Sequence, residues 1–326
     1  MLLRKAGFAN LGGSVRRSNA FRLTQSLIGV AAVTIDCRKC LAVIAFLPTL
    51  LFTPVTTAAD DPADSTKYLL RYRFSPGETV VYEVTHVAKT KTRLRGSEEV
   101  SQVHTVSDKV WNFHANSSAE GMTFEHSVAK VVMMQQTGEK PELRWDSSTK
   151  EEPPVEFEKV AEQLGSPLST VTIDPRGLET NRKTHAGTES ELGMGGLTIS
   201  LPEEPIAVGA SWNVPREVKA RGESGEVKVM KVREVYTLEK VETGVATLSI
   251  RSEVLTPITE ESIKAQLVQQ LSDGSVRFDI DNGRVLAKQL DWDESVVGFQ
   301  GPNSLMEYRA RLTETLKDGP VRTAKR

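Results

Sequence analysis

Long stretches in which apolar and polar side chains alternate run through most of this chain after residue 66. From Thr79 to Leu94, every second residue lies on one mostly apolar face, and the residues between them form a mostly polar face. The first face carries Val80, Tyr82, Val84, His86 and Ala88. A two-residue period of this kind is typical of a strand with one dry and one solvated face, as antiparallel sheets have. We therefore expect a mainly β fold built from antiparallel meander sheets.

Glycine-containing turns separate the alternating stretches and predict hairpins. The turn Asp281-Asn282-Gly283 between the stretches 276–280 and 284–292 is a strong hairpin signal. In the stretch 99–114, the apolar positions change phase after Val110, which predicts a β-bulge there. The other expected strands are the stretch after residue 122, 169–174 with 178–182, 226–241 with 245–255, and 305–316.

One short helix is expected near 155–164. Pro153-Pro154 stands directly before this segment and Gly165 directly after it, which is the usual asymmetry between a helix start and a helix stop. The segment 259–271 is ambiguous, because Ile263 and Leu267 have helical spacing while the apolar residues between 263 and 271 also alternate as in a strand. We interpret 259–271 as a strand.

Composition divides the chain into two expected β-lobes. The expected boundaries are 1–59 for a leader, 60–66 for a flexible lead-in, 67–183 for lobe 1 with the helical insertion, 184–200 for a Gly-rich linker, 201–316 for lobe 2 and 317–326 for a disordered tail. Similar turns occur late in each lobe, at 173–178 and at 280–285. They raise the hypothesis that the lobes are duplicated half-barrels. The alternative is one continuous sheet whose turns resemble each other by chance.

The leader has the order of a secretory signal. Arg38-Lys39 precedes the apolar run 41–52, and the small residues 56–59 follow it as a cleavage site. This order predicts export to the periplasm or beyond the cell. An uncleaved anchor is the weaker alternative, because a bilayer-spanning helix needs about 20 apolar residues. The unusual length of the leader also suggests a start codon placed too early.

Cleavage near Ala59 changes the chemistry of the remaining chain. Both cysteines, Cys37 and Cys40, leave with the signal, so redox and zinc functions based on their C-x-x-C spacing are excluded. The leader carries seven of the 41 basic residues and one of the 43 acidic residues, so the mature chain has a net charge of −8. This balance argues against a nucleic-acid partner, which needs a basic surface.

No motif in the mature chain predicts a catalytic, cofactor-binding or metal-ligating residue. Three patterns come nearest, and we interpret them as hydrogen-bonded histidines, a hairpin turn and a solvated strand end. They are the histidines His86, His104, His114 and His126 on successive expected strands with His185 in a loop, the calcium-loop-like residues Asp279, Asp281 and Asn282, and the acidic group Asp291, Asp293 and Glu294. A calcium loop would need Gly at its sixth position and Glu at its twelfth. Counted from Asp279, Gly283 is fifth and Leu290 is twelfth.

Four segments resemble those of a family of exported bacterial β-rich proteins of unknown function. They are residues 74–82, 173–177, 201–212 and 278–285. The resemblance implies a secreted β-rich domain with two halves, and it brings no site residues.

We expect a non-enzymatic exported protein that binds an apolar ligand or an envelope component, with the ligand in a cavity beneath the helix at 155–164. The alternatives are a hydrolase whose site is assembled only in three dimensions and a structural protein that assembles through its sheet edges.

Overall fold

The computed structural model describes residues 66–118, 121–185 and 197–317. The leader at 1–59, nearly all of the lead-in, most of the 184–200 linker and the tail after residue 317 lie outside the described residues. Within the described ranges, no helix is both long enough and apolar enough to cross a bilayer.

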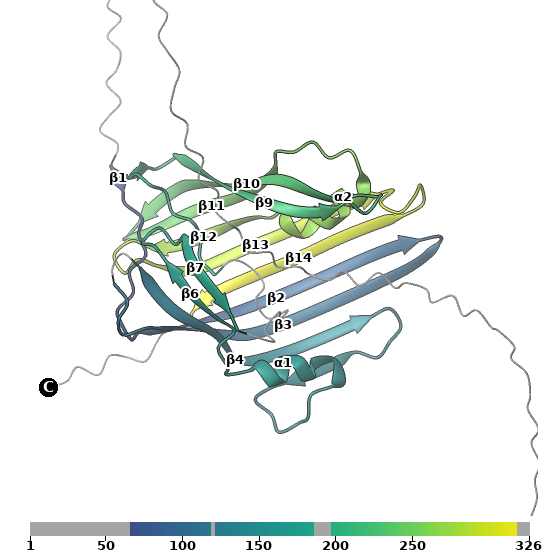
Figure 1. Ribbon diagram of the computed structural model, residues 1–326, viewed down its shortest axis with the longest axis horizontal. Coiled ribbons are helices and arrows are strands. Elements are labelled where there is room, and N and C mark those ends of the chain that lie inside the picture. The colour runs from purple at the N-terminus through teal and green to yellow at the C-terminus, as the bar shows by residue number, and fades with distance from the viewer. Residues whose placement is uncertain (1–65, 119–120, 186–196, 318–326) are drawn as a thin grey trace, which may run out of the picture.

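Most strands belong to one sheet of 12 strands in which paired neighbours are antiparallel (Figure 1). The strand order is β7-β6-β4-β3-β2-β14-β13-β12-β11-β10-β9, with β5 paired to β4 beside this path. The bounds are β2 Thr79–Leu94, β3 Ser97–Phe113, β4 Met122–Thr137, β5 Leu143–Asp146, β6 Ser169–Ile173, β7 Glu179–Thr184, β9 Ser211–Arg221, β10 Val227–Glu242, β11 Val245–Val254, β12 Asp273–Asp279, β13 Arg284–Val297 and β14 Leu305–Leu316. A separate pair joins β1 Lys67–Tyr68 to β8 Ile206–Ala207. This architecture confirms the expected antiparallel, mainly β meander.

The first and last long strands, β2 and β14, pair in the middle of the sheet. Tyr82 lies opposite Leu316 and Arg93 lies opposite Leu305. We call this pairing the seam, because strands β2 to β7 form the sheet on one side of it and strands β9 to β14 form the other side. The predicted lobes are thus two halves of one continuous sheet. Their origin by duplication stays a prediction.

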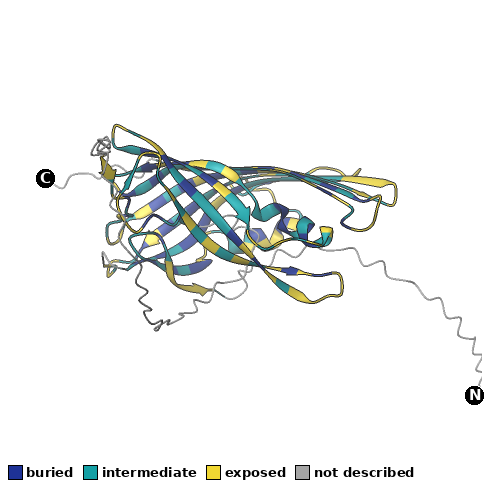
Figure 2. Ribbon diagram, turned by 90° about the horizontal axis from the view of Figure 1, so that it is seen from above, coloured by how far each residue is buried: buried dark blue, intermediate teal, exposed yellow. Residues whose placement is uncertain are grey.

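The curved sheet buries its inner face. In β2, the side chains of Val80, Tyr82, Val84 and His86 are buried, while Val87 between them is 46% exposed. Buried and exposed residues alternate in the same way along other strands (Figure 2). The inner face therefore carries the core, as the two-residue period of the sequence predicts.

The first expected helix is present, whereas the prediction of a strand at 259–271 is wrong. The first helical segment consists of η1, Val155–Phe157, and α1, Glu158–Gln163. The segment that we interpreted as a strand forms α2, Glu261–Leu267, followed by η2, Val268–Gln270. Its apparent alternation has a physical reason. Ile263 and Leu267 pack with Ala220 and Met230, while Ala265 packs with a second cluster that contains Tyr308, so α2 is apolar on two sides.

The predicted bulge in 99–114 is also misplaced. The pairing of β2 with β3 has no register shift, and the shift lies between β3 and β4, where Ala129 of β4 has no partner. The apolar phase changes because Val106 and Val110 point to the outer face, whereas Trp111 and Phe113 point inward. The inward positions between Val106 and Val110 are Ser107 and Lys109, and both are buried.

Two stretches without long strands cross one end of the sheet and fill it. We call residues 68–74 and 197–206 the end plug. Leu70, Tyr72, Leu197, Ile199 and Leu201 are all buried in the largest core cluster. The last three fall in or next to the predicted linker, so its described end is part of the core.

The end plug is held by the two hairpin turns that resemble each other in sequence. The Tyr72 N–H donates to the Pro175 carbonyl at 2.7 Å, and the Arg73 N–H donates to the Gly283 carbonyl at 2.9 Å. At Gly177, whose φ is +79°, an added Cβ would lie 2.4 Å from the Tyr72 ring and 2.6 Å from the Ile199 carbonyl oxygen. Glycine is needed there for the left-handed backbone and for the close approach.

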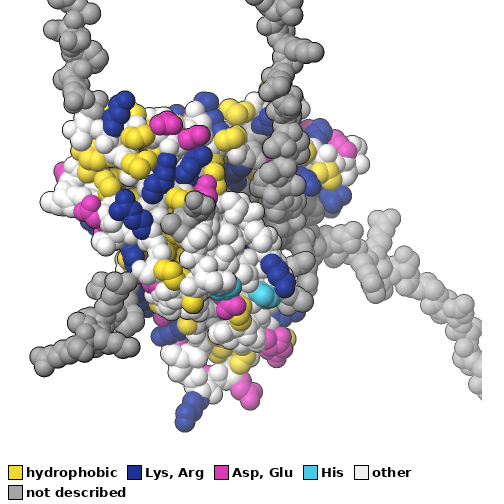
Figure 3. Space-filling model, turned by 60° about the vertical axis from the view of Figure 1, so that its left-hand side comes forward, with side chains coloured by type: hydrophobic (Ala, Val, Ile, Leu, Met, Phe, Trp, Pro, Cys, Tyr) yellow, Lys and Arg dark blue, Asp and Glu magenta, His cyan; other side chains and the backbone are white. Residues whose placement is uncertain are grey.

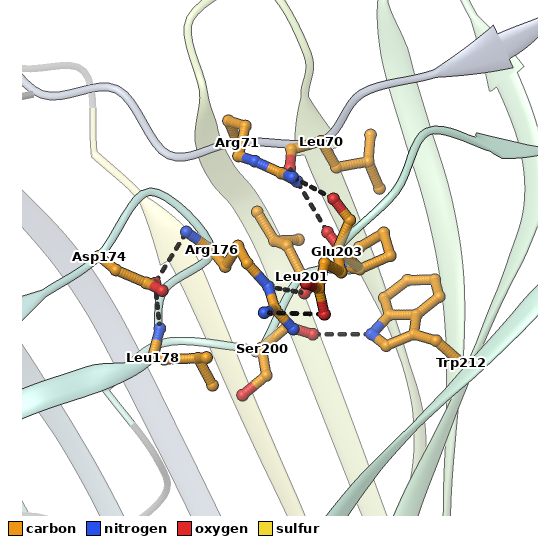
Figure 4. Close-up of polar contacts among 10 residues, drawn as sticks. Leu70, Arg71, Asp174, Arg176, Leu178, Ser200, Leu201, Glu203 and Trp212 are labelled. Atoms are coloured by element: carbon orange, nitrogen blue, oxygen red, sulfur yellow. Dashed lines mark hydrogen bonds and ion pairs between the residues drawn. The ribbon is translucent and has the colours of Figure 1, made fainter. Parts of the chain in front are cut away.

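Polar groups of the end plug have partners close by (Figure 4). The Arg71 guanidinium donates to the carbonyls of Pro202 and Glu203, and the Arg176 Nε donates to the Leu201 carbonyl at 3.3 Å. The Trp212 indole N–H donates to the Ser200 carbonyl at 2.8 Å. These bonds give donors to the carbonyls of the buried Leu201 and Pro202 and of their neighbours Ser200 and Glu203.

Candidate functional site

Three charged side chains meet on the inner face of the sheet, beside the seam. The Lys109 Nζ lies 2.6 Å from the Glu314 Oε1, and the Lys288 Nζ lies 2.8 Å from the Glu314 Oε2. All three side chains are buried, with 8%, 6% and 3% of Lys109, Lys288 and Glu314 exposed. Charged residues are rarely buried to this extent, so the group is the clearest concentration of chemistry in the described chain.

Strand register explains how residues so distant in sequence meet. Glu314 of β14 lies directly opposite Lys288 of β13 on one side and Val84 of β2 on the other. Lys109 of β3 lies opposite Tyr82 of β2, one strand farther from Glu314. Neighbouring strands are about 4.8 Å apart, so the long Lys109 side chain reaches across β2 to the carboxylate. The three side chains therefore connect both sides of the seam.

The electrostatics of this group follow from burial and mutual attraction. Burial by itself raises the pKa of Glu314, but the ammonium groups of Lys109 and Lys288 outweigh it and hold this pKa at about 2. Burial lowers the pKa of Lys109 to about 8, against the attraction of Glu314. At neutral pH Glu314 is thus ionised and Lys109 is mostly protonated.

Four buried polar atoms around these charges have no hydrogen-bond partner in the structure. They are the Tyr82 hydroxyl, the Trp111 indole Nε1, the His126 Nε2 and the Ser169 Oγ. The register places them together on the inner face, because His126 pairs with both Trp111 and Ser169, and Tyr82 pairs with Lys109. An unpartnered buried polar group costs about 1–3 kcal/mol, so a natural structure rarely gathers several in one place. We call these four residues together with Lys109, Glu314 and Lys288 the seam cluster.

Aromatic rings form the wall of the seam cluster. The Lys109 Nζ lies 5.4 Å from the centre of the Tyr82 ring and 5.3 Å from that of Trp111. The Trp111 ring stacks on Phe124 at 4.7 Å. The ammonium group is therefore held partly by cation–π attraction, which is strongest where water is excluded.

The histidines that the sequence placed on successive strands do not meet. His86 and His126 are buried on the inner face, and burial lowers their pKa values to about 4 and about 3, so both are neutral at pH 7. His104 is exposed, His114 lies 4.0 Å from Glu125, and the His185 Nε2 lies 3.1 Å from the Thr170 hydroxyl. Within the described ranges, no group of three or more His, Cys, Asp or Glu residues is arranged to hold a metal ion.

Three residues of the acidic patterns, Asp279, Asp291 and Asp293, have local partners. The Asp279 carboxylate accepts hydrogen bonds from the Asn282 N–H and from its side-chain amide, both at 2.8 Å, so it shapes the hairpin turn. Asp291 pairs with Arg311 at 2.5 Å and Asp293 pairs with Arg309 at 3.0 Å.

The space beneath the first helix is filled. Phe157 and Val160 pack there against Val131 and Trp145, and all four are buried. The ligand cavity that we expected in this place is therefore absent. Beside it lies a depression of about 320 Å³ lined by Val106, Met134 and other residues of β3, β4 and β5. A depression of about 570 Å³ lies between the hairpin tips near Arg95 and Asn303.

The surface and the sheet edges show fewer features of a binding site than the interior does. On the face shown in Figure 3, apolar side chains are interspersed with basic and acidic ones, which is ordinary for a protein surface. The edge strand β7 is six residues long and exposed throughout, and the edge strand β9 carries Pro215. Short polar edges and edge prolines oppose pairing with another sheet.

Sequence reasoning missed the seam cluster. The sequence does not single out Lys109, because the change in the apolar pattern around it is interpreted as a β-bulge. Glu314 and Lys288 stand in strands whose alternation is ordinary. One signal was present: each occupies a position whose neighbours two residues away include apolar residues of the inward face, such as Trp111 for Lys109 and Leu312 for Glu314.

Comparison with known proteins adds little to this geometry. No protein-family model and no curated protein matches the chain. Among solved structures, the chain is similar to one described as "lipid-protein interactions in lipovitellin", with 12% sequence identity and a TM-score of 0.41. The similarity covers 78% of this chain and 26% of that chain, so the chain spans about a quarter of its length.

Proposed function

We propose that this chain is an exported, non-enzymatic binding protein that holds an apolar ligand, such as an envelope component, on the inner face of its curved sheet. The observation that supports the proposal is the seam cluster, where several buried polar atoms without partners are set in an aromatic wall. Binding sites for small molecules have this composition, with mostly apolar walls and a few convergent polar groups. Export follows from the leader as a sequence-based expectation.

The apolar part of the ligand would lie on the part of the inner face next to the seam cluster. Ala88 and Val103 lie opposite each other on the inner face of β2 and β3, and Leu290 and Trp292 follow Lys288 on β13. All four side chains are only partly buried. An apolar ligand that covered them would gain about 25 cal/mol for each Å² removed from water.

The bonding of the titratable groups favours binding over catalysis. Glu314 is already bonded to two ammonium groups. Its pKa of about 2 and the His126 pKa of about 3 lie far below the near-neutral pKa of an efficient general base. The assembly alternative is disfavoured by the short, exposed edge strand β7 and by Pro215 in the edge strand β9.

Ligand extraction and probe binding test the proposal. The full chain would be purified from its host envelope, and its organic extract would be analysed by mass spectrometry. The delipidated protein would then be titrated with a neutral naphthylamine fluorophore. We expect a stoichiometric apolar compound in the extract and a saturable rise in fluorescence that this compound reverses. An empty extract together with an unsaturable fluorescence response would overturn the proposal.

A further inference from the structure

We infer that the bound ligand carries an anionic head group, such as a carboxylate, and that Lys109 receives it within the seam cluster. This inference rests on the proposed function and specifies its ligand class. It comes from two properties of the side chains in the cluster. One is the sum of their charges, and the other is the set of hydrogen-bond donors that lack an acceptor.

The charge balance favours an anion. Two lysines face one glutamate, and all three are almost completely buried. The neighbouring His126 is neutral at pH 7, because burial and then the charge of Lys109 lower its pKa to about 3. One bound carboxylate would bring the buried charge to zero. A cationic head group would add to the excess, and a neutral one would leave it in place.

The hydrogen-bond balance points the same way. An ammonium group has three donors and no acceptor, and an indole N–H is a donor only. Lys109 uses one donor on the Glu314 Oε1, while the Trp111 N–H and the Tyr82 hydroxyl have no partner. The two Glu314 oxygens are each bonded to a lysine. The Trp111 N–H and the remaining Lys109 donors therefore lack acceptors, while the Tyr82 and Ser169 hydroxyls can donate or accept, and a carboxylate supplies acceptors without adding a donor.

The surroundings suit an acid whose remainder is apolar. The Tyr82 and Trp111 rings lie against the Lys109 ammonium group, and the Phe124 ring stacks on Trp111. Along the sheet, Ala88 and Leu290 continue the inner face away from the charges. A long-chain fatty acid has this combination of a single anionic end and an apolar chain. A small inorganic anion shares only the head-group chemistry.

A matched set of ligands separates the possibilities. The delipidated full chain would be titrated with a long-chain fatty acid, the alcohol of equal chain length, and inorganic phosphate, each in competition with the neutral fluorophore. The wild type would be compared with Lys109→Met and with Lys89→Met, whose exposed lysine lies on the outer face of β2. Trp111→Phe is a second variant that removes one donor and keeps an aromatic ring at this position. Circular dichroism would confirm the fold of each variant.

We expect the wild type and Lys89→Met to bind the acid at least about tenfold more tightly than the alcohol, which is about 1.4 kcal/mol. Lys109→Met should lose this preference while it binds the alcohol as before, and Trp111→Phe should weaken only acid binding, by a few-fold. Phosphate that competed as well as the acid would show that the apolar chain plays no part and would overturn the ligand class.

Equal binding of acid and alcohol by wild type and Lys109→Met would also overturn the inference, although the proposed function would stand. If the fluorophore, acid and alcohol all failed to bind, the proposed function itself would fail. If Lys109→Met did not fold, the acid-to-alcohol ratio of Trp111→Phe would decide: an unchanged ratio would count against the inference.

Discussion

The end plug contains the buried Tyr72 and bonds to the partly buried Trp212 of β9, whereas the seam cluster contains the buried Tyr82 and Trp111, and the hydrogen bonding of these polar groups differs between the two regions. In the end plug, the Tyr72 hydroxyl accepts a hydrogen bond from the Ile199 N–H at 3.0 Å, and the Trp212 N–H donates to Ser200. In the seam cluster, the Tyr82 hydroxyl and the Trp111 N–H have no partner.

This difference separates a region that stabilises the fold from a region suited to a ligand. A buried polar group that is fully hydrogen-bonded fixes one arrangement of the chain around it. A buried polar group without a partner carries a cost of about 1–3 kcal/mol that a bound molecule could offset. We therefore interpret the end plug as a structural region and the seam cluster as the proposed site of ligand binding.

Lowering the pH should destabilise the protein more than any single substitution in the seam cluster does. Glu314 has a folded pKa of about 2, and His86 and His126 have folded pKa values of about 4 and about 3. All three lie below the unfolded values, which are about 4.3 for Glu and about 6.5 for His. The stability they contribute is complete above pH 6.5 and is lost as the pH falls through 4 towards 2, at about 1.4 kcal/mol for each pKa unit.

Denaturant unfolding at a series of pH values from 8 to 3 measures this loss. A variant with both His86→Gln and His126→Gln should show a smaller slope between pH 6.5 and pH 4, whereas the exposed-site variant His104→Gln should follow the wild type. A slope that does not depend on the two buried histidines would contradict the assignment.

Glu314→Gln should be the most damaging single substitution in the seam cluster. It leaves two buried ammonium groups without a counter-charge, and breaking a buried ion pair costs about 3–5 kcal/mol. Lys109→Met should be tolerated, because Glu314 and Lys288 remain a neutral pair. Chemical denaturation measures both. Glu307→Gln, on the outer face of the same strand, is the control, and a similar small loss for Glu314→Gln would show that the buried charges are not coupled.

Gly177→Ala should loosen the end plug. Gly177 and Gly165 have φ values of +79° and +74°, but only the Cβ at 177 would meet other atoms. Both variants should lose about 1–2 kcal/mol to left-handed backbone strain. Gly177→Ala should lose about 1–3 kcal/mol more to overpacking against Tyr72 and Ile199. Thermal and denaturant unfolding compare the two, and equal losses would mean that the close contact costs nothing.

The pair Tyr72→Phe and Tyr82→Phe gives the smallest effect and the most direct comparison. Tyr72→Phe leaves the buried Ile199 N–H without its acceptor and should cost about 1–3 kcal/mol. Tyr82→Phe removes an unpartnered hydroxyl and should cost nothing in ligand-stripped protein. Unfolding of both variants checks this. A loss for Tyr82→Phe as large as that for Tyr72→Phe would mean that its hydroxyl is hydrogen-bonded in solution.

Much of the fold could be predicted from the sequence because strand formation depends on local patterns. The expected strands 79–94 and 305–316 coincide with β2 and β14, and the hairpin around Asp281-Asn282-Gly283 joins β12 to β13. The helix near 155–164 follows from its proline and glycine punctuation. The segment 259–271 was misread, because burial on two sides of α2 produces the same alternation as a strand.

The sequence by itself determined the antiparallel β character, most strand bounds and the turn glycines, since each follows from side-chain period or backbone freedom within a few residues. Only the tertiary structure decided that β2 pairs with β14 and that Lys109 meets Glu314, which is 205 positions away. Such a meeting depends on strand order and register across the whole sheet, and one polar residue in an alternating strand looks the same whether or not a counter-charge lies opposite it. The seam cluster can therefore be recognised only in the tertiary structure, where the two sides of the sheet lie next to each other.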